Sequence, residues 1–283
     1  MNTNILIADG GGSSIDWRYI DDEGNISQYK SQGWNATADQ GIILSAIIEK
    51  DVLSVEIIQP KEIYYYGAGC GTVSNQEKTA AIFQKVYPKA NTHVASDILG
   101  AARALCGDQA GLVAILGTGS NLCVYDGEKI STQSPSLGYL LGDEGSGAYL
   151  GKQLIQDFCY GKMPEELANR FQRKFRMSPD EIIQAVYNQD FPNTYLASFT
   201  HFIQKFIDTP YCTQLLLSAF KDFTQQHVAA YKSEENNLLY ATGSIAFHFS
   251  RYLEAALETQ GLHLRKVLQS PIAALALYHL DSE

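Results

Sequence analysis

The feature that most constrains the fold of this chain is one sequence pattern that occurs twice. Each copy predicts a strand, a glycine-rich loop, a second strand, a tight turn and a third strand, because β-prone runs alternate with turn residues. The first copy starts at Ile5 and contains the loop DGGG, and the second starts at Leu112 and contains LGTGSN. A single copy could be an ordinary hairpin, in which Asp-Gly turns are common. Two copies with glycine loops at corresponding places predict an internal duplication.

Helix and strand signals alternate after each copy, which predicts a mixed α/β protein. After the first copy we expect a helix capped by Thr37, a strand in EIYYYGAG, a helix whose capping box is Ser74 and Glu77, and a helix starting at Ser96. After the second copy, helices are expected to dominate residues 144–232. The signals expected in the C-terminal part are the capping box of Ser178 and Glu181, a strand, turn and helix in NLLYATGSIAFHF, and a last helix starting at Ser270 and Pro271.

The composition limits the classes of partner and site. The 283 residues carry a formal net charge of −10, so no nucleic-acid partner is expected, although backbone N–H groups can still bind a nucleotide. The five cysteines are widely spaced, and neither CxxC nor HExxH occurs, so a zinc or iron–sulfur site has no local support. Free thiols, no signal peptide and no long apolar run predict a cytoplasmic protein that does not enter a membrane.

The paired loops DGGG and LGTGSN, with ATGS later in the chain, resemble the actin-like ATPase and sugar kinase superfamily. The similarity is greatest to its N-acetylglucosamine kinase branch, which includes the BadF/BadG/BcrA/BcrD-type ATPases, because GWN, SDILGAARAL, LGTGSN and LGYLLGDEGSGAYLG occur in that family's order. The resemblance implies a duplicated, two-lobed α/β fold of the actin-like (ribonuclease H-like) type with an active-site cleft between the lobes. We expect lobes at residues 1–107 and 108–270, with the last helix, 271–283, packing on the first.

The first glycine loop is expected to bind the phosphates of ATP, and Asp9, just before it, to hold Mg²⁺. The resemblance implies phosphate contacts from Gly10, Gly11, Gly12 and Ser13. The family usually continues with Thr, then Lys or Arg, then Thr or Ser, whereas this chain has Ser13, Ser14 and Ile15. A missing cation weakens the charge stabilisation on which phosphoryl transfer depends, so slow or absent turnover stays open.

The second glycine loop and a late turn are expected to complete the nucleotide site. The resemblance implies phosphate contacts from Gly117, Thr118 and Gly119, and it places Gly243 and Ser244 against the adenosine. The alternative for these residues is a tight hairpin loop and a tight connection from strand to helix, both of which also favour glycine.

Asp97 matches the family's catalytic aspartate, which would accept the proton of a sugar hydroxyl as general base. The residues alone favour a helix start, because Ser and Asp are common N-caps and an acid suits the first turn of a helix. The two roles are compatible.

The resemblance implies that the sugar is contacted by Asn35, Asp97, Ser120, Asn121 and Asp143. Asp143 and Glu144 lie in GDEGSG, and carboxylates hydrogen-bond well to sugar hydroxyls. Without the resemblance, the same two acids are explained equally well as the start of a helix. The run from Tyr64 to Gly71, YYYGAGCG, lacks the third glycine of a dinucleotide fingerprint, so it is predicted to be a buried strand.

Together these features predict an ATP- and Mg²⁺-dependent kinase that phosphorylates N-acetylglucosamine or a related N-acetylhexosamine. Its partners would be the sugar, the nucleotide and, from the resemblance, a second copy in a homodimer. Two alternatives stay open. One is a non-catalytic sugar or nucleotide sensor, suggested by Ser14 and Ile15; the other is a BadF-type ATPase activator, in which Cys123 and Cys159 would help hold an iron–sulfur cluster shared by two subunits.

Overall fold

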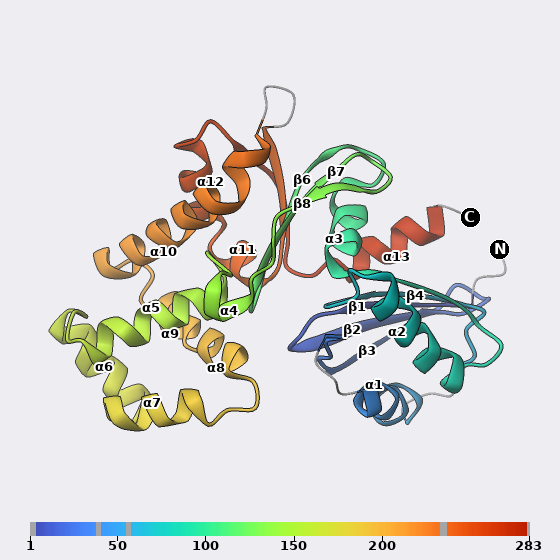
Figure 1. The fold of residues 1–283 in the computed structure, drawn as a ribbon, viewed down its shortest axis with the longest axis horizontal. Coiled ribbons are helices and arrows are strands. Elements are labelled where there is room, and N and C mark those ends of the chain that lie inside the picture. Colours follow the sequence, from blue (N-terminus) through green and yellow to red (C-terminus); the bar gives the residue numbers. More distant parts are fainter. Residues whose placement is uncertain (1–3, 38–40, 55–57, 233–236, 282–283) are drawn as a thin grey trace. The chain divides into compact units, whose positions relative to one another are not determined.

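The computed structural model of the chain describes residues 4–37, 41–54, 58–232 and 237–281. The chain divides into two compact units, and Figure 1 labels most of their helices and strands. Unit 1 comprises Met1–Gln109, Asp126–Ile130 and Ser270–Glu283, and unit 2 comprises Ala110–Tyr125 and Ser131–Gln269. The lobe boundaries expected from the sequence stay a prediction.

Unit 1 is built on a five-stranded sheet in the order β3-β2-β1-β4-β5. β1 is antiparallel to β2 and parallel to β4, β2 is antiparallel to β3, and β4 is parallel to β5. The strands are β1 (Ile5–Gly10), β2 (Ser14–Ile20), β3 (Ile26–Gln32), β4 (Glu62–Gly67) and β5 (Asn91–Ser96). The helices are α1 (Gly41–Ile47), the π-helix η1 (Ile48–Leu53), α2 (Val73–Val86), α3 (Asp97–Cys106) and α13 (Ile272–Asp281).

The two faces of this sheet carry different side chains, because successive residues of a strand point to opposite sides. One face is apolar: Trp17, Tyr65 and Phe83 of α2 belong to one buried cluster, and the Trp17 and Tyr65 ring centroids lie 6.2 Å apart. The register pairs Asp9 with Asp16 and with Tyr66, so these three side chains share the opposite face. The acids therefore lie on the face of the sheet opposite this aromatic cluster.

Helix α13 packs against α3, β1 and β2 within unit 1. The imidazole of His279 stacks on the ring of Tyr64 with centroids 3.8 Å apart, and its Nε2 lies 2.8 Å from the hydroxyl of Tyr66. Burial, together with the nearby charges of Arg103 and His93, lowers the pKa of His279 to about 4. The ring is therefore neutral at neutral pH, and the helix docks without burying an uncompensated charge.

Unit 2 repeats the sheet of unit 1 strand for strand. Its order is β8-β7-β6-β9-β10, with β6 antiparallel to β7 and parallel to β9, and β9 parallel to β10. The duplication predicted from the two glycine loops is therefore confirmed at the level of topology. The strands are β6 (Gly111–Leu116), β7 (Ser120–Tyr125), β8 (Ile130–Gln133), β9 (Leu238–Thr242) and β10 (His263–Leu268).

Helices make up most of the rest of unit 2, as expected for residues 144–232. They bury a large apolar cluster that includes Phe171, Phe199, Phe202 and Phe220. The helical segments are α4 (Gly138–Leu141), α5 (Gly147–Cys159), α6 (Glu165–Phe175), α7 (Pro179–Tyr187), α8 (Pro192–Ser198), α9 (Thr200–Lys205), α10 (Pro210–Phe223), the π-helix η2 (Thr224–Val228), the 3₁₀-helix η3 (Ala229–Tyr231), α11 (Ser244–His248) and α12 (Ser250–Glu258).

Five helix starts were predicted from the sequence, and those at Ser96 and Ser178 are confirmed. Ser178 and Glu181 form the complete capping box of α7, and the Ser96 hydroxyl caps α3 by accepting from the N–H of Leu99. The box of Ser74 and Glu77 is wrong, because the hydroxyl of Thr72 caps α2 by accepting from Asn75, which places Ser74 inside the helix.

The remaining two predicted starts differ from expectation. Thr37 lies in a turn and donates both its N–H and its hydroxyl to Oδ1 of Asn35, and residues 38–40, where its helix would start, lie outside the described residues. Ser270 donates its hydroxyl to Oδ2 of Asp16 at 3.3 Å, and α13 starts at Ile272. Strand β10 was not expected, because its pairing with β9 is decided by tertiary structure.

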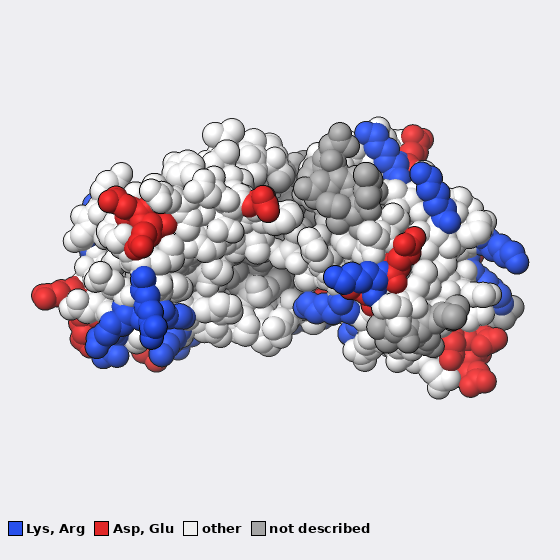
Figure 2. Space-filling model, turned by 90° about the horizontal axis from the view of Figure 1, so that it is seen from below, with Lys and Arg blue, Asp and Glu red and all other residues white. Residues whose placement is uncertain are grey.

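In the part of the chain that is described, no helix is both long and apolar enough for a membrane crossing. On the face drawn in Figure 2, acidic and basic side chains lie in small groups between large uncharged areas. The basic groups form no continuous stripe over the described residues of that face.

Candidate active site

Three acids of unit 1 lie near one another at one end of its sheet. Asp9 near the end of β1 is the cross-strand partner of Asp16 in β2, and Asp97 follows directly after β5. The ends of β1, β4 and β5 lie side by side, because Gly10 pairs with Gly67 and Gly67 pairs with Ser96. The structure thus brings Asp9 and Asp97 to one sheet edge, although they are far apart in the sequence.

The negative charge at this edge is only partly compensated. The pKa of Asp9 is raised to about 7, mostly by burial and also by the charges of Asp97 and Asp16, while the charge of Lys30 acts to lower it. Lys30 lies 3.6 Å from Oδ1 of Asp16 and offsets part of the negative charge. A raised carboxyl pKa means that the ionised form is under-stabilised, and a divalent cation would correct this.

Asp97 is the first residue of α3, and the pKa of its carboxyl is raised. Its pKa is raised to about 6, because the effect of burial exceeds the opposite effect of the hydrogen bond that its Oδ1 accepts from the N–H of Ile98 at 2.8 Å. The helix start therefore fixes the carboxyl without satisfying it completely. The capping role falls to Ser96, which leaves the predicted catalytic role of Asp97 open.

The first glycine loop is a four-residue hairpin turn supported from below by the segment GWN. The N–H of Gly11 donates to the carbonyl of Ser14 at 2.9 Å, and the N–H of Trp34 donates to the carbonyl of Gly11 at 3.2 Å. Only glycine fits at position 33, because a Cβ there would lie 2.4 Å from the backbone carbonyl of Gly12. Gly12 itself is exposed, with open space where a Cβ would be. Ser13 is exposed beside it.

Asn35 follows Trp34 and belongs to unit 1. Its Oδ1 accepts a hydrogen bond from Thr37. The same oxygen lies against Gly69, so the turn after β4 packs directly on the Asn35 side chain. The predicted buried strand in YYYGAGCG is confirmed by Tyr65 and Tyr66. The buried Nε1 of Trp34 and the buried hydroxyl of Tyr65 have no hydrogen-bond partner among the described residues, which is rare for buried polar groups.

In unit 2 the second glycine loop is held by the start of α5. The N–H of Gly147 donates to the carbonyl of Gly117 at 2.8 Å, and the N–H of Ala148 donates to the carbonyl of Thr118 at 3.0 Å. Within the loop, the N–H of Gly117 donates to the carbonyl of Gly119. The loop is therefore fixed by backbone bonds, which leaves its partly exposed surface available for a ligand.

The predicted sugar-contacting residues of unit 2 cluster beside this loop. Oδ1 of Asp143 accepts from the N–H of Ser120 at 3.3 Å, and Oδ1 of Asn121 accepts from the N–H of Leu122 and from Gln133. Asp143 has a φ of 59°, which is uncommon for a residue with a side chain and points to a functional constraint. Burial raises the pKa of Asp143, and the bond from Ser120 lowers it. The buried Ser120 hydroxyl has no partner among the described residues.

Gly243 and Ser244 also reach this cluster. Gly243 joins β9 to α11 with a φ of 108°, and a Cβ there would lie 2.3 Å from the carbonyl of Leu116. The turn therefore needs glycine, and this close approach brings it next to Gly117 of the second loop. Ser244, the first residue of α11, is exposed.

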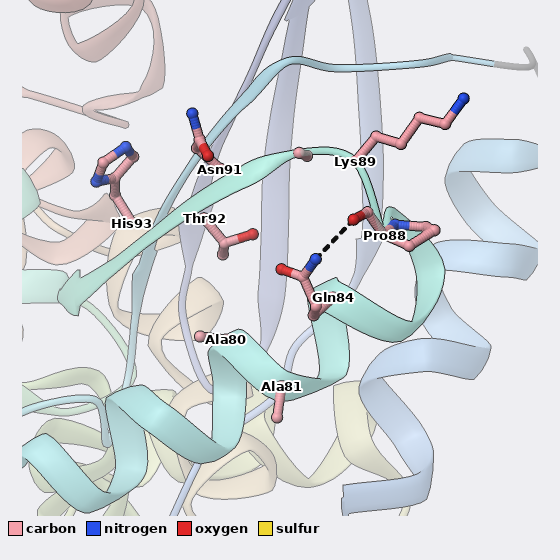
Figure 3. A pocket seen from close by; sticks show the side chains of 9 residues that line it. Ala80, Ala81, Gln84, Pro88, Lys89, Asn91, Thr92 and His93 are labelled. Atoms are coloured by element: carbon pink, nitrogen blue, oxygen red, sulfur yellow. Dashed lines mark hydrogen bonds between the residues drawn. The ribbon is translucent and has the colours of Figure 1, made fainter.

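One hollow of the surface contains none of these residues. Figure 3 shows it between the C-terminal part of α2 and β5, with a volume of about 620 Å³, and the Nε2 of Gln84 donates to the carbonyl of Pro88 beside it. Its lining is mostly short side chains without an acid. We do not assign it to the candidate site, because the chemistry-bearing residues lie elsewhere.

Sequence reasoning missed three residues of this site. Asp16 could have been found from the hairpin register, since pairing Gly10 with Ile15 also pairs Asp9 with Asp16. The orphaned Trp34 and Tyr65 polar atoms give no sequence signal, because only their burial makes them unusual.

No protein-family model matches the chain, and no curated protein matches it. Among solved structures, a candidate N-acetylglucosamine kinase from Porphyromonas gingivalis shares 37% identity over 98% of this chain and 99% of its own, with a TM-score of 0.90. A candidate N-acetylglucosamine kinase from Chromobacterium violaceum shares 18% identity over 97% and 98%, with a TM-score of 0.71. A ROK family glucokinase from Streptomyces griseus, in complex with glucose and AMPPNP, shares 16% identity over 96% and 98%, with a TM-score of 0.55. The last two share the fold.

Proposed function

The chain belongs to the family of actin-like sugar kinases that contains the Porphyromonas gingivalis relative, and we propose that it phosphorylates N-acetylglucosamine or a related N-acetylhexosamine with ATP. In this reaction an oxygen of the sugar bonds to the γ-phosphorus of ATP, ADP leaves, and the hydroxyl proton passes to the enzyme. The phosphorylated sugar and ADP are the products.

The observation that carries this proposal is the state of Asp97. Its Oδ1 accepts a hydrogen bond from the N–H of Ile98, and its pKa is raised to about 6. A general base is most effective when its pKa lies near the working pH, and this shift brings Asp97 closer to neutral pH. We assign to it the proton of the sugar hydroxyl. The proton would then leave to solvent when the products dissociate.

We propose that Asp9, with Asp16 beside it, holds Mg²⁺ in the complex with ATP. The residues fit such an ion, because the raised carboxyl pKa of Asp9 reports uncompensated negative charge, and Mg²⁺ typically binds one or two carboxylates plus phosphate oxygens. When bound, the ion would supply charge stabilisation to the transferring phosphoryl group. The loops at Gly10–Gly12 with Ser13, and at Gly117–Gly119, would contact the phosphates, and Gly243 and Ser244 the adenosine.

We propose that Asn35, Ser120, Asn121 and Asp143 contact the sugar. Two observations support this assignment. Asp143 has an uncommon positive φ of 59°, which is typical of residues at ligand-binding sites. The buried hydroxyl of Ser120 has no hydrogen-bond partner among the described residues, and a sugar hydroxyl would supply one. A cytoplasmic location is proposed because none of the five cysteines, all of which lie among the described residues, forms a disulfide. The homodimer stays a prediction that light scattering can check.

One observation favours a second candidate, a sugar or nucleotide sensor. Ile15, at a family position that usually carries a hydroxyl, is 0% exposed in the core and cannot reach a phosphate. An ATPase activator is disfavoured, since Cys123 is also 0% exposed inside β7, where two subunits could not share it as a cluster ligand.

The proposal is tested with purified full-length protein, MgATP and a panel of N-acetylhexosamines, by following ADP formation and the phosphorylated sugar by mass spectrometry. Sugar-dependent ADP formation is expected. Binding of N-acetylglucosamine by calorimetry without turnover would select the sensor, and neither binding nor turnover with any sugar of the panel would overturn both.

A further inference from the structure

A hydrogen-bonded chain of three side chains lies behind the acidic turn of unit 2. Oε2 of Glu144 lies 2.9 Å from Nε2 of His227, and Nδ1 of His227 lies 2.8 Å from the Oγ of Ser134. The three residues come from the turn before α5, from the π-helix η2 and from the segment after β8. Such π-helical insertions are frequent at functional sites.

The directions of these hydrogen bonds follow from the chemistry of the groups. An ionised carboxylate only accepts, so the hydrogen between Glu144 and His227 sits on Nε2. In the neutral ring Nδ1 then has a lone pair, which accepts from the hydroxyl of Ser134. Ser134 is fixed in turn, because its N–H donates to the carbonyl of Leu122 at 2.9 Å.

The trio has the composition of a Ser–His–acid hydrolase triad but not its accessibility. Ser134 is 4% exposed and His227 is 8% exposed, so no substrate carbonyl could reach the serine. Only the Glu144 end of the chain is partly open to solvent. The trio therefore acts on Glu144 and not on a substrate of its own.

Glu144 is the immediate neighbour of Asp143, and their charges interact, since Glu144 raises the pKa of Asp143. Among the described residues, Glu144 accepts one side-chain hydrogen bond, through Oε2, which leaves Oε1 for a ligand. The turn is held against α10, because a Cβ on Gly145 would lie 2.8 Å from Cβ of Phe223. Phe223 also packs on the ring of His227 with centroids 5.4 Å apart.

We propose that Ser134 and His227 form a positioning relay that aims the Glu144 carboxylate, and that Glu144 joins Asp143 in reading two hydroxyls of the sugar. This inference rests on the proposed function and adds to it a substrate-contacting residue, Glu144, and two positioning residues. Since each acid of the pair is fixed by its own partner, Asp143 by Ser120 and Glu144 by His227, the pair is preorganised for a polyhydroxyl ligand.

The test compares the KM and kcat for N-acetylglucosamine with MgATP, and the Kd of the sugar by calorimetry, among wild type and variants. E144Q and H227F are expected to raise KM and Kd about tenfold with kcat little changed, because a hydrogen bond to a charged group is lost or misplaced. H227Q, which restores a donor near the position of Nε2, should stay within about threefold of wild type. H227N, which reaches only toward Ser134, should resemble H227F.

The double variant E144Q/H227F should lose no more than either single variant, because both changes remove the same interaction. The matched control is H263Q, a change of an exposed histidine in the same unit that should leave every constant unchanged. If H227F does not fold, S134A, H227Q and H227N carry the comparison, and ¹⁵N NMR of wild type should show the hydrogen of His227 on Nε2.

Equal constants for E144Q and wild type, or equal losses for H227Q and H227F, would overturn the relay alone, as would a neutral ring with its hydrogen on Nδ1. A wild-type protein that binds no sugar would instead overturn the proposed function, and the relay's role would fall with it.

Discussion

The two glycine-loop hairpins have the same strand pairing but different chemistry. In unit 1 the pair next to the hairpin end is Asp9 with Asp16, whereas in unit 2 the corresponding pair is Ile115 with Asn121. In unit 2 the acid is Asp143, which lies in the segment between α4 and α5 and not in a strand of the sheet. Duplicated topology has thus kept the loop and its support while the charges were redistributed.

In both hairpins the glycines are of two kinds, which differ in the space available for a side chain. Each unit has one loop glycine with open space for a methyl group, Gly12 or Gly117, and one supporting glycine without it, Gly33 or Gly243. The first kind is free for a ligand and the second holds the loop. Four predictions test how far the two hairpins are equivalent, from the largest expected effect to the smallest.

Replacing the proposed general base, Asp97 of unit 1, should have the largest effect. D97N is expected to lower kcat by a factor of about 10²–10⁴, the usual contribution of a general base. Sugar-dependent ADP formation measures it. The control S96A removes the cap of α3 and should lower the free energy of unfolding by about 1 kcal/mol while keeping kcat. Equal kcat for D97N and wild type would remove Asp97 from the reaction.

Removing the charge of Asp9 should stabilise the protein without ligand. Because the folded-state pKa is raised to about 7 from 3.8, the folded protein binds more protons than the unfolded chain, so this penalty grows as pH rises from about 4 to 7 and is complete above it. D9N should gain about 2 kcal/mol at pH 8, less than the full shift implies, because Asp9 as a residue is only intermediate in burial.

Urea unfolding of D9N and wild type at pH 8 and pH 4 measures this gain, which should vanish at the lower pH. MgATP should then stabilise wild type more than D9N. If D9N were less stable than wild type at pH 8, the pair of Asp9 and Asp16 would instead stabilise the hairpin, which would contradict the prediction.

The supporting glycines should matter for folding in both units. G33A and G243A each force a methyl group into backbone atoms and should lower the free energy of unfolding by about 1–3 kcal/mol. Thermal unfolding without ligands measures the loss. A loss in only one unit would break the equivalence of the two hairpins.

The open glycines should give the smallest effect, and one seen only with nucleotide. G12A and G117A should leave the melting temperature unchanged and raise the KM for ATP about tenfold each, because the methyl group occupies space proposed for phosphate. An unchanged KM in G12A with a raised KM in G117A would assign the phosphates to the second loop alone.

Much of the fold could be predicted because it is encoded locally. The two hairpins, the cap at Ser96 and the box of Ser178 and Glu181 each depend on residues within a few positions of one another. The box of Ser74 and Glu77 failed for a local reason too: Thr72, two residues earlier, offered a competing cap. Strand β10 could not be predicted, since among the described residues it pairs with β9, from which α11 and α12 separate it in the sequence.

The sequence alone determined the repeated hairpin, the glycines that its loops require and the acids within reach of them. Only the tertiary structure decided that Asp9 and Asp97 share a sheet edge with raised carboxyl pKa, and that His227 reaches back over 83 residues to Glu144. The reason is physical: turn and cap preferences act over a few residues, whereas burial and the field of neighbouring charges exist only once distant segments are packed together.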